Sequence, residues 1–158
     1  MTMTITRDET KRIISAIEGM AKARLFVGIP GEKSGRKDGA IGNASLGYIH
    51  ENGSPARNIP ARPFLVPGVR EISGKIADVL KSYAAKAVTG GATIDQGLNA
   101  AGLIAQAAVK RRIISQEGFT PLMDSTIKAR KRAGKSGTKA LIRIGQLLNS
   151  ITYVIKRK

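Results

Sequence analysis

Apolar residues recur every three or four positions in three segments of the chain, and this period predicts amphipathic helices. The segments run over 7–22, 67–88 and 93–117. The middle segment has the clearest repeat, which consists of Val69, Ile72, Ile76, Val79 and Tyr83. Thr6 with Glu9, and Thr93 with Gln96, have the spacing of a capping box, in which side-chain and backbone groups pair at a helix start.

Two shorter segments have the character of strands. Leu25, Val27 and Ile29 alternate with residues of other types, and the Pro-Gly pair that follows predicts the end of a strand. Residues 151–155 are rich in β-branched and aromatic side chains and predict a terminal strand.

The remaining segments predict connections and short helices. Residues 31–45 are Gly-rich and polar and predict a mobile loop; a short helix or turn over 46–51 ends at Gly53. Three prolines make 54–63 extended. Residues 119–140 predict an irregular arm with a short helix through Arg132, and 141–148 a further short helix.

These elements predict one domain over residues 1–158. Its class is α+β, a small, mainly antiparallel sheet of three or four strands with two long helices packed on one face. The length of 158 residues and a hydrophobic content of 42% are sufficient for a core. No apolar run is long enough to predict a membrane span, and we expect synthesis in the cytoplasm of a host cell.

Positive charge is concentrated in the last third of the chain. The formal net charge is +16, and residues 106–158 contain 13 of the 27 basic residues and 2 of the 11 acidic ones. Such a density indicates an anionic partner, either an acidic protein surface or nucleic acid. The arm supplies six candidate contacts for it: Lys128, Arg130, Lys131, Arg132, Lys135 and Lys139.

Catalytic chemistry is poorly supplied, and we expect no enzyme, no cofactor and no metal. There is no Cys and one His, which excludes Cys-based sites and multi-His metal centres within one chain. His50 and Glu51 are the one His–carboxylate pair, but neighbours on a helix point in different directions. A role in bracing the turn before Gly53 fits them better than a role in catalysis.

Two segments resemble a known family. The first has Leu46, then His50-Glu51-Asn52-Gly53, then Ile59-Pro60-Ala61-Arg62-Pro63-Phe64-Leu65. The second has Thr120-Pro121-Leu122, Ser125-Thr126-Ile127, Lys131, Leu141-Ile142 and Gly145-Gln146-Leu147-Leu148-Asn149-Ser150-Ile151. In this order they resemble the tail-completion and neck proteins that join head and tail in tailed bacteriophages, the phage virion morphogenesis type. Asn52 and Ile144 depart from the family pattern, where an aromatic residue and Thr are common.

This resemblance implies a structural protein of the virion rather than an enzyme. Its implied partners are copies of itself in a ring, typically of six, and the adjacent portal, adaptor and tail-tube proteins; DNA passes through the lumen. Within the first motif, we expect Phe64 and Leu65 to plug the core. We expect Arg62 to make a bidentate contact with a carboxylate, either within the chain or across the ring. The alternative is that Arg62, Pro63 and Phe64 only fix the entry to the next helix.

A small basic nucleic-acid-binding protein is the alternative. The sequence pI of 10.7 fits it, but aromatic residues make up 4% of the chain and include no Trp, so base stacking is poorly supplied. Phosphate contacts by the arm alone would be independent of sequence.

Overall fold

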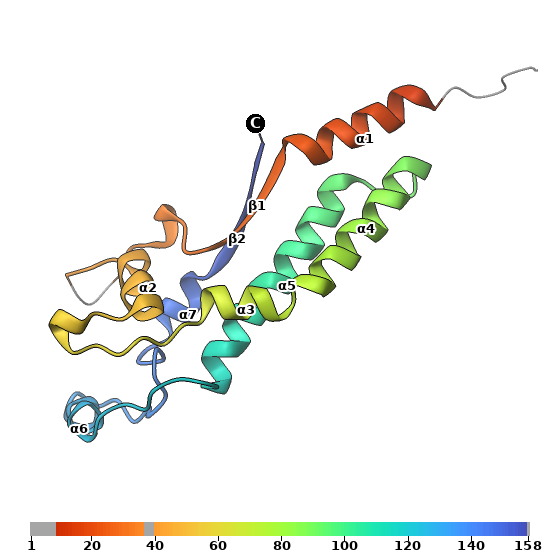
Figure 1. Cartoon of the computed structure of the whole chain (residues 1–158). Helices are drawn as coiled ribbons and strands as arrows, with labels where there is room; N and C mark the ends of the chain where they lie inside the picture. The colour runs from red at the N-terminus through yellow and green to blue at the C-terminus, as the bar shows by residue number, and fades with distance from the viewer. Residues whose placement is uncertain (1–8, 37–39, 158) are drawn as a thin grey trace, which may run out of the picture.

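The computed structural model describes residues 9–36 and 40–157, and it is mostly helical with a two-stranded antiparallel sheet. Figure 1 shows an elongated molecule with α1 and α6 at opposite ends. In the first half, the elements are α1 (Thr10–Lys22), β1 (Ala23–Gly28), the 3₁₀ turn η1 (Gly31–Lys33), α2 (Asn43–Asn52) and η2 (Pro55–Arg57). The second half contains α3 (Leu65–Glu71), α4 (Ser73–Thr89), α5 (Ile94–Ser115), α6 (Asp124–Arg132), α7 (Gln146–Ser150) and β2 (Thr152–Arg157).

The sheet is smaller than the sequence predicts. Strands β1 and β2 pair from Ala23 with Arg157 to Gly28 with Thr152, and the predicted three or four strands are therefore wrong for the described part of the chain. The proline-rich stretch that was available for a further strand makes a single bridge instead, between Ser54 and Ile59. Its prolines lack the N–H groups that a ladder needs. The α+β class holds broadly, with a minimal sheet.

Helix α5 organises the rest of the molecule. It packs against both strands, against α3 and against α4, which lies beside it on the side away from the sheet (Figure 1). Small residues permit this closeness: a Cβ at Gly97 would meet Tyr83 of α4, and a Cβ at Gly102 would overlap the ring of Tyr153 in β2. The ring of Tyr153 in β2 therefore packs directly against α5 at Gly102.

Helix ends follow the local signals where the residues are described. At the start of α5, Thr93 accepts a hydrogen bond from Gln96 N while Gln96 returns one to Thr93 N, which confirms the predicted capping box. Gly90 ends α4 with φ of 80°. The first predicted capping box includes Thr6, which lies outside the described residues; α1 begins at Thr10 rather than 7.

The long helix predicted over 67–88 is two helices. They break at Ile72, whose φ of −112° and ψ of 12° are not helical. Ser73-Gly74 follows directly, and Gly/Ser pairs are frequent sites of helix kinks. The short helix expected over 141–148 is also shifted, since α7 begins after Gly145, whose φ is 75°.

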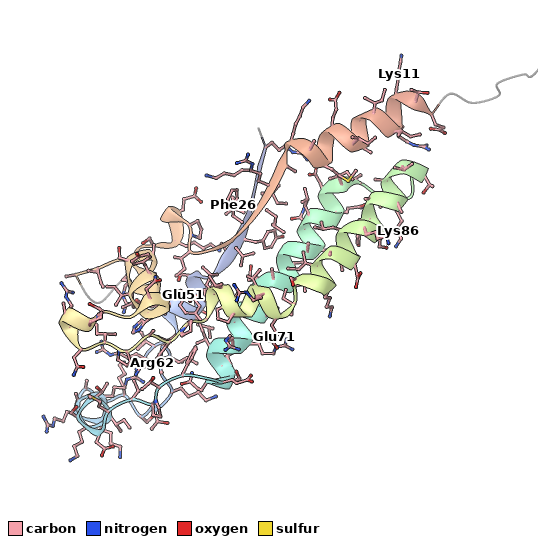
Figure 2. The ribbon with its side chains drawn as sticks, viewed as in Figure 1. Lys11, Phe26, Glu51, Arg62, Glu71 and Lys86 are labelled. Atoms are coloured by element: carbon pink, nitrogen blue, oxygen red, sulfur yellow. The ribbon has the colours of Figure 1, made fainter. Side chains whose placement is uncertain are left out.

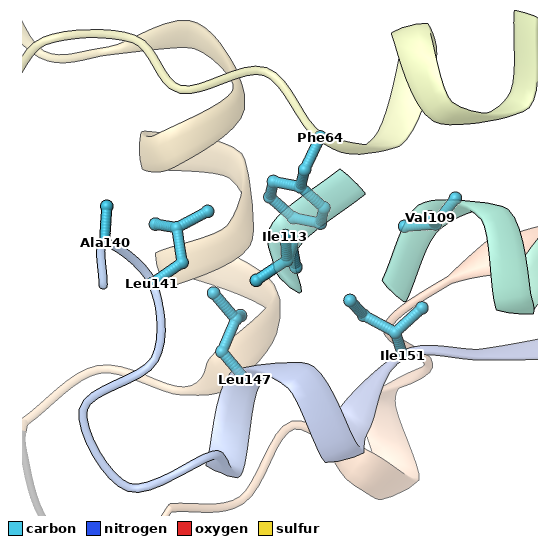
Figure 3. Packing of buried hydrophobic residues seen from close by; sticks show 7 residues of the cluster. All are labelled: Phe64, Val109, Ile113, Ala140, Leu141, Leu147 and Ile151. Carbon is cyan, nitrogen blue, oxygen red and sulfur yellow. The ribbon is translucent and has the colours of Figure 1, made fainter. Parts of the chain in front are cut away.

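One cluster of buried apolar residues lies between the second half of α5, the start of α3 and residues 140–151. Its members are Phe64, Val109, Ile113, Ala140, Leu141, Leu147 and Ile151, which Figure 3 shows converging from four segments. Phe64 is 2% exposed, and Leu65 packs against this cluster, so the prediction that both plug the core is confirmed.

Candidate functional site

The carboxylate of Glu51 stabilises the start of α3. Its Oε2 accepts hydrogen bonds from the backbone N–H groups of Phe64 (2.7 Å) and Leu65 (2.8 Å), and its Oε1 accepts one from Val66 (2.9 Å). These N–H groups have no partner within the helix, and a negative charge there is favourable. Glu51 therefore ties the end of α2 to the start of α3, rather than bracing the turn at Gly53 as the sequence suggested.

Gly53 allows the chain to reverse after α2. Its φ is 77°, its N–H bonds to Ile49 O at 2.7 Å, and a Cβ there would lie 2.9 Å from Ala61 N. Both the backbone conformation and the lack of space require glycine. The reversal brings Arg62 N within 2.7 Å of His50 O.

Arg62 joins two segments that are far apart in the sequence. Its Nε donates to Thr120 O at 2.7 Å and its Nη2 to Pro121 O at 3.1 Å, and the residue is 6% exposed. No described carboxylate of the chain bonds Arg62, so the predicted contact within the chain is wrong, while a contact across a ring stays a prediction. The acceptors are carbonyls of the extended stretch after α5, which has no neighbouring strand to bond them. The guanidinium fork spans two successive carbonyls and so replaces that partner. Figure 2 labels Arg62 between the 53–64 segment and α6.

The six basic residues predicted as one contact group divide into two sets. Arg130 donates to the carbonyls of Gly137 (3.0 Å) and Lys139 (2.9 Å), and Lys139 Nζ donates to Ile114 O (2.8 Å), so both hold the arm in place. The other four form an exposed set, Lys128, Lys131, Arg132 and Lys135. This exposed set, on and just after α6, is the basic face of the arm.

A cavity of about 810 Å³ lies between the two motif segments. Its walls come from α2, residues 53–62, residues 120–130 and the turn at 141–147. Four arginines line it, Arg36, Arg62, Arg130 and Arg143, and no Asp or Glu is among the described lining residues. We call this the basic cavity.

Two polar atoms of the cavity lining are buried without a hydrogen-bond partner among the described residues, His50 Nδ1 and Gln146 Oε1. Burial, with smaller effects from the nearby charges of Arg62 and Arg36, lowers the pKa of His50 to about 4. Burial also lowers the pKa of Arg130, as do Arg143 and Arg62. The imidazole is therefore neutral at neutral pH, and the arginines lie close enough to affect one another.

Sequence reasoning assigned no role to Arg36, Arg143 or Gln146. Gln146 lies within a motif segment, but Arg36 follows the 3₁₀ turn η1, far from that segment in the sequence. Asn43, at the start of α2, bonds both Gly35 and Arg36. Its Oδ1 accepts from Arg36 Nη1 (3.2 Å), and its Nδ2 donates to Gly35 O (3.1 Å). This anchor places Arg36 at the cavity.

No metal centre or membrane-spanning helix was found. Within 9–36 and 40–157, no three or more His, Asp or Glu side chains come together as metal ligands would, and no helix is long and apolar enough to span a bilayer. The chain matches no protein-family model, no curated protein and no solved structure.

Proposed function

We propose that this chain is a structural virion protein of a tailed bacteriophage, a ring subunit at the joint between head and tail. The observation that carries the proposal is that the two segments resembling neck and tail-completion proteins fold against each other. Arg62 of the first segment bonds Thr120 and Pro121 of the second. A motif shared by structural proteins is expected to consist of such residues, which build the fold, rather than of reactive groups.

An exposed apolar surface suits contact between copies in the ring. Ile14 is 50% exposed and Ile17 54% on α1, and Phe26 on β1 is 49% exposed; Met20 lies on the same helix. A ring uses heterologous contacts, in which this surface of one copy packs on a different surface of the next. Ile14, Ile17 and Met20 follow each other at intervals of three on α1, a helical spacing, and exposed apolar side chains at such spacing suit contact with another chain.

The basic face of the arm suits contact with the other, anionic components of the head–tail joint. Lys128, Lys131, Arg132 and Lys135 are exposed at the end of the molecule opposite α1 (Figure 1). A ring subunit placed between portal-side adaptor and tail tube would meet acidic protein surfaces there, or DNA passing through the lumen.

Disruption of the gene in the source phage or induced prophage tests the proposal. We expect electron microscopy of the lysate to show DNA-filled heads and tails that are not joined, with joining restored by the wild-type gene. Normal, infectious particles from the disrupted phage would contradict the proposal.

The alternative is a small basic nucleic-acid-binding protein, and the basic face of the arm is the observation that favours it. Phosphate contacts by four exposed cations would be strongly salt-dependent. The ratio of absorbance at 260 and 280 nm after purification distinguishes the two functions, since three Tyr and no Trp leave the protein's own absorbance low. Retained nucleic acid that high salt removes would favour the alternative.

A further inference from the structure

We infer that the basic face of the arm binds the phosphate backbone of double-stranded DNA without reading its sequence. The inference rests on the proposed function only for the choice of DNA over RNA, since DNA passes through a head–tail joint. Its chemistry stands on the four exposed cations themselves, Lys128, Lys131, Arg132 and Lys135.

The four cations have no acidic side chains in their own segment. Asp124 is the last Asp or Glu of the sequence, so residues 125–139 carry six basic side chains and no acidic one. None of the four exposed side chains has a hydrogen bond or an ion pair among the described residues. The dipole of α6 favours cations in its last turn, but Lys128 lies before that turn and Lys135 lies after the helix. The excess charge therefore indicates an anionic partner.

Hydrogen bonds of the backbone fix the segment that carries the face. Gly134 ends α6 with φ of 69°, and its N–H donates to Lys131 O at 3.0 Å. Lys135 N–H donates to Arg130 O at 2.9 Å. These two bonds form a Schellman motif, which keeps Lys135 beside the last turn, and the Arg130 side chain holds the turn that follows. Cations on a backbone already held in place lose less conformational freedom on binding.

The exposed composition of the arm fits phosphate better than protein. Every exposed residue between 125 and 139 is Lys, Arg, Ser, Thr, Gly or Ala, and none has a large apolar or aromatic side chain. The core of a protein interface is enriched in aromatic side chains and depleted in Lys, Ser and Ala. Contacts to nucleic-acid phosphates come instead from Lys, Arg, Ser and Thr. An acidic protein surface is therefore the weaker candidate, and it is an outcome of the test below.

The same composition favours a duplex over a single strand. Proteins that bind single strands stack unpaired bases on aromatic rings, and the exposed residues of the arm provide no ring. The bases of a duplex are already stacked and paired, and its backbone offers phosphates to cations. Lys128 lies three and four residues before Lys131 and Arg132, so the three share one side of α6. Such a row of cations, without base contacts, would hold DNA and still allow it to slide.

One copy binds weakly, and a ring binds more strongly. Four phosphate contacts predict that the affinity falls about 150-fold between about 50 and 200 mM salt, so one copy releases DNA at moderate salt. Copies joined in a ring would present the face several times to one duplex, and linked weak contacts add up. Nucleic acid retained through purification is therefore not expected here, unlike for the alternative function.

Salt-dependent binding to the purified full-length chain tests the inference. Fluorescence anisotropy follows a labelled duplex DNA of about 30 base pairs and a labelled polyglutamate, each over a range of salt concentrations. We expect the logarithm of the DNA affinity to fall with the logarithm of the salt concentration with a slope of about −3.6, which is about 0.9 for each phosphate contact. At equal salt, DNA should bind about threefold or more tightly than polyglutamate, because its charges are more densely spaced.

Matched pairs of substitutions locate the contact. Lys128→Gln with Lys131→Gln removes two charges from the basic face of the arm. Lys75→Gln with Lys81→Gln removes two from exposed positions on α4, away from α6 (Figure 1). Both double variants have the same net charge, and all four positions are exposed, so the fold should be kept. We expect the first pair to flatten the slope to about −1.8 and the second to change it by less than about 0.5.

The outcomes separate this inference from its rivals. A slope that the α4 pair flattens as much as the arm pair, or that neither pair changes, would overturn the inference. Arm substitutions that weaken polyglutamate binding and leave DNA binding unchanged would assign the face to an acidic protein instead. Failure to bind DNA would leave the proposed function intact, since a ring subunit that meets only protein needs no phosphate contact. Absence of the chain from particles would contradict the proposed function and leave a measured phosphate contact unaffected.

Discussion

The two ends of the molecule are held together by different interactions. At the helical end, α1, α4, α5 and the sheet pack through small residues, such as Gly97 against Tyr83 and Gly102 against Tyr153. At the cavity end, α2, the 53–64 segment, α6 and the 141–151 segment are joined by charged side chains that bond backbone groups, notably Glu51, Arg62 and Arg130. Arg12 of α1 also donates to Val88 O at the helical end (3.1 and 2.8 Å), and a buried apolar cluster lies at the cavity end. The ends therefore differ in how many backbone groups depend on side chains for their hydrogen bonds.

This difference has a consequence for function. At the helical end, large apolar side chains of α1 and β1 remain exposed and available to another copy. At the cavity end, the segments that connect the short helices have backbone carbonyls that Arg62 and Arg130 bond, and both arginines also line the cavity. Substitution of Glu51, Arg62 or Arg130 should therefore act mainly through lost hydrogen bonds, and substitution of Gly97 or Gly102 through packing.

The largest expected effect is at the cavity end. Glu51→Ala leaves three N–H groups of the α3 start without their acceptor, and we expect unfolding to become easier by about 3 kcal/mol. Urea denaturation measures this change. Glu117→Ala, an exposed carboxylate near the end of α5, is the control, with an expected change within about 0.5 kcal/mol. Equal effects of the two would remove the distinction between the ends.

A smaller effect is expected from glycine at the helical end. Gly102→Ala places a Cβ against the Tyr153 ring and should destabilise the chain by about 2 kcal/mol. Gly74→Ala is its counterpart in α4, where nothing lies within 4 Å of the added Cβ. There the change should stabilise the chain by about 0.5 kcal/mol, because alanine favours the helix. Thermal unfolding of both variants checks the opposite signs.

His50 predicts a pH dependence confined to the cavity end. Its pKa in the folded chain is about 4, below the ordinary value of 6.5, because of burial and the charges of Arg62 and Arg36. The unfolded chain therefore binds the proton more readily, and the contribution to stability is complete above pH 6.5 and is lost as the pH falls toward 4. Subtracting the profile of His50→Gln from that of the wild type isolates this effect. A flat difference across the window would contradict it.

The smallest effect on folding, with a large effect on assembly, is expected at α1. Ile17 is 54% exposed, so Ile17→Glu should change stability by less than about 0.5 kcal/mol while it weakens contact between copies. Sedimentation at high protein concentration, or incorporation into particles, measures the contact. Lys11→Glu, on an exposed position of the same helix, is a control for charge. Unchanged incorporation of Ile17→Glu would exclude this surface from the ring.

Local signals in the sequence predicted most of the helices and both strands. The Thr93–Gln96 capping box and the glycines at 53 and 90 act through neighbouring backbone atoms, so their structural effect can be inferred from residue type and spacing. The break at Ile72 also had a local signal, Ser73-Gly74, which the apolar repeat through it outweighed.

The cavity could not be predicted in the same way. Arg62 and its acceptors Thr120 and Pro121 are more than fifty residues apart, and nothing in their spacing indicates that guanidinium and carbonyls meet. An arginine in an extended segment fits a carboxylate partner equally well from sequence alone. Only the fold around α5 brings both motif segments and Arg36 to one space.

The copy number of the chain in purified particles tests the central claim most directly. Quantitative mass spectrometry of particles from the source phage or induced prophage should give about six copies, or a small multiple, for a closed ring at the head–tail joint. Absence from the particles, or hundreds of copies as in a tube or shell, would contradict the account.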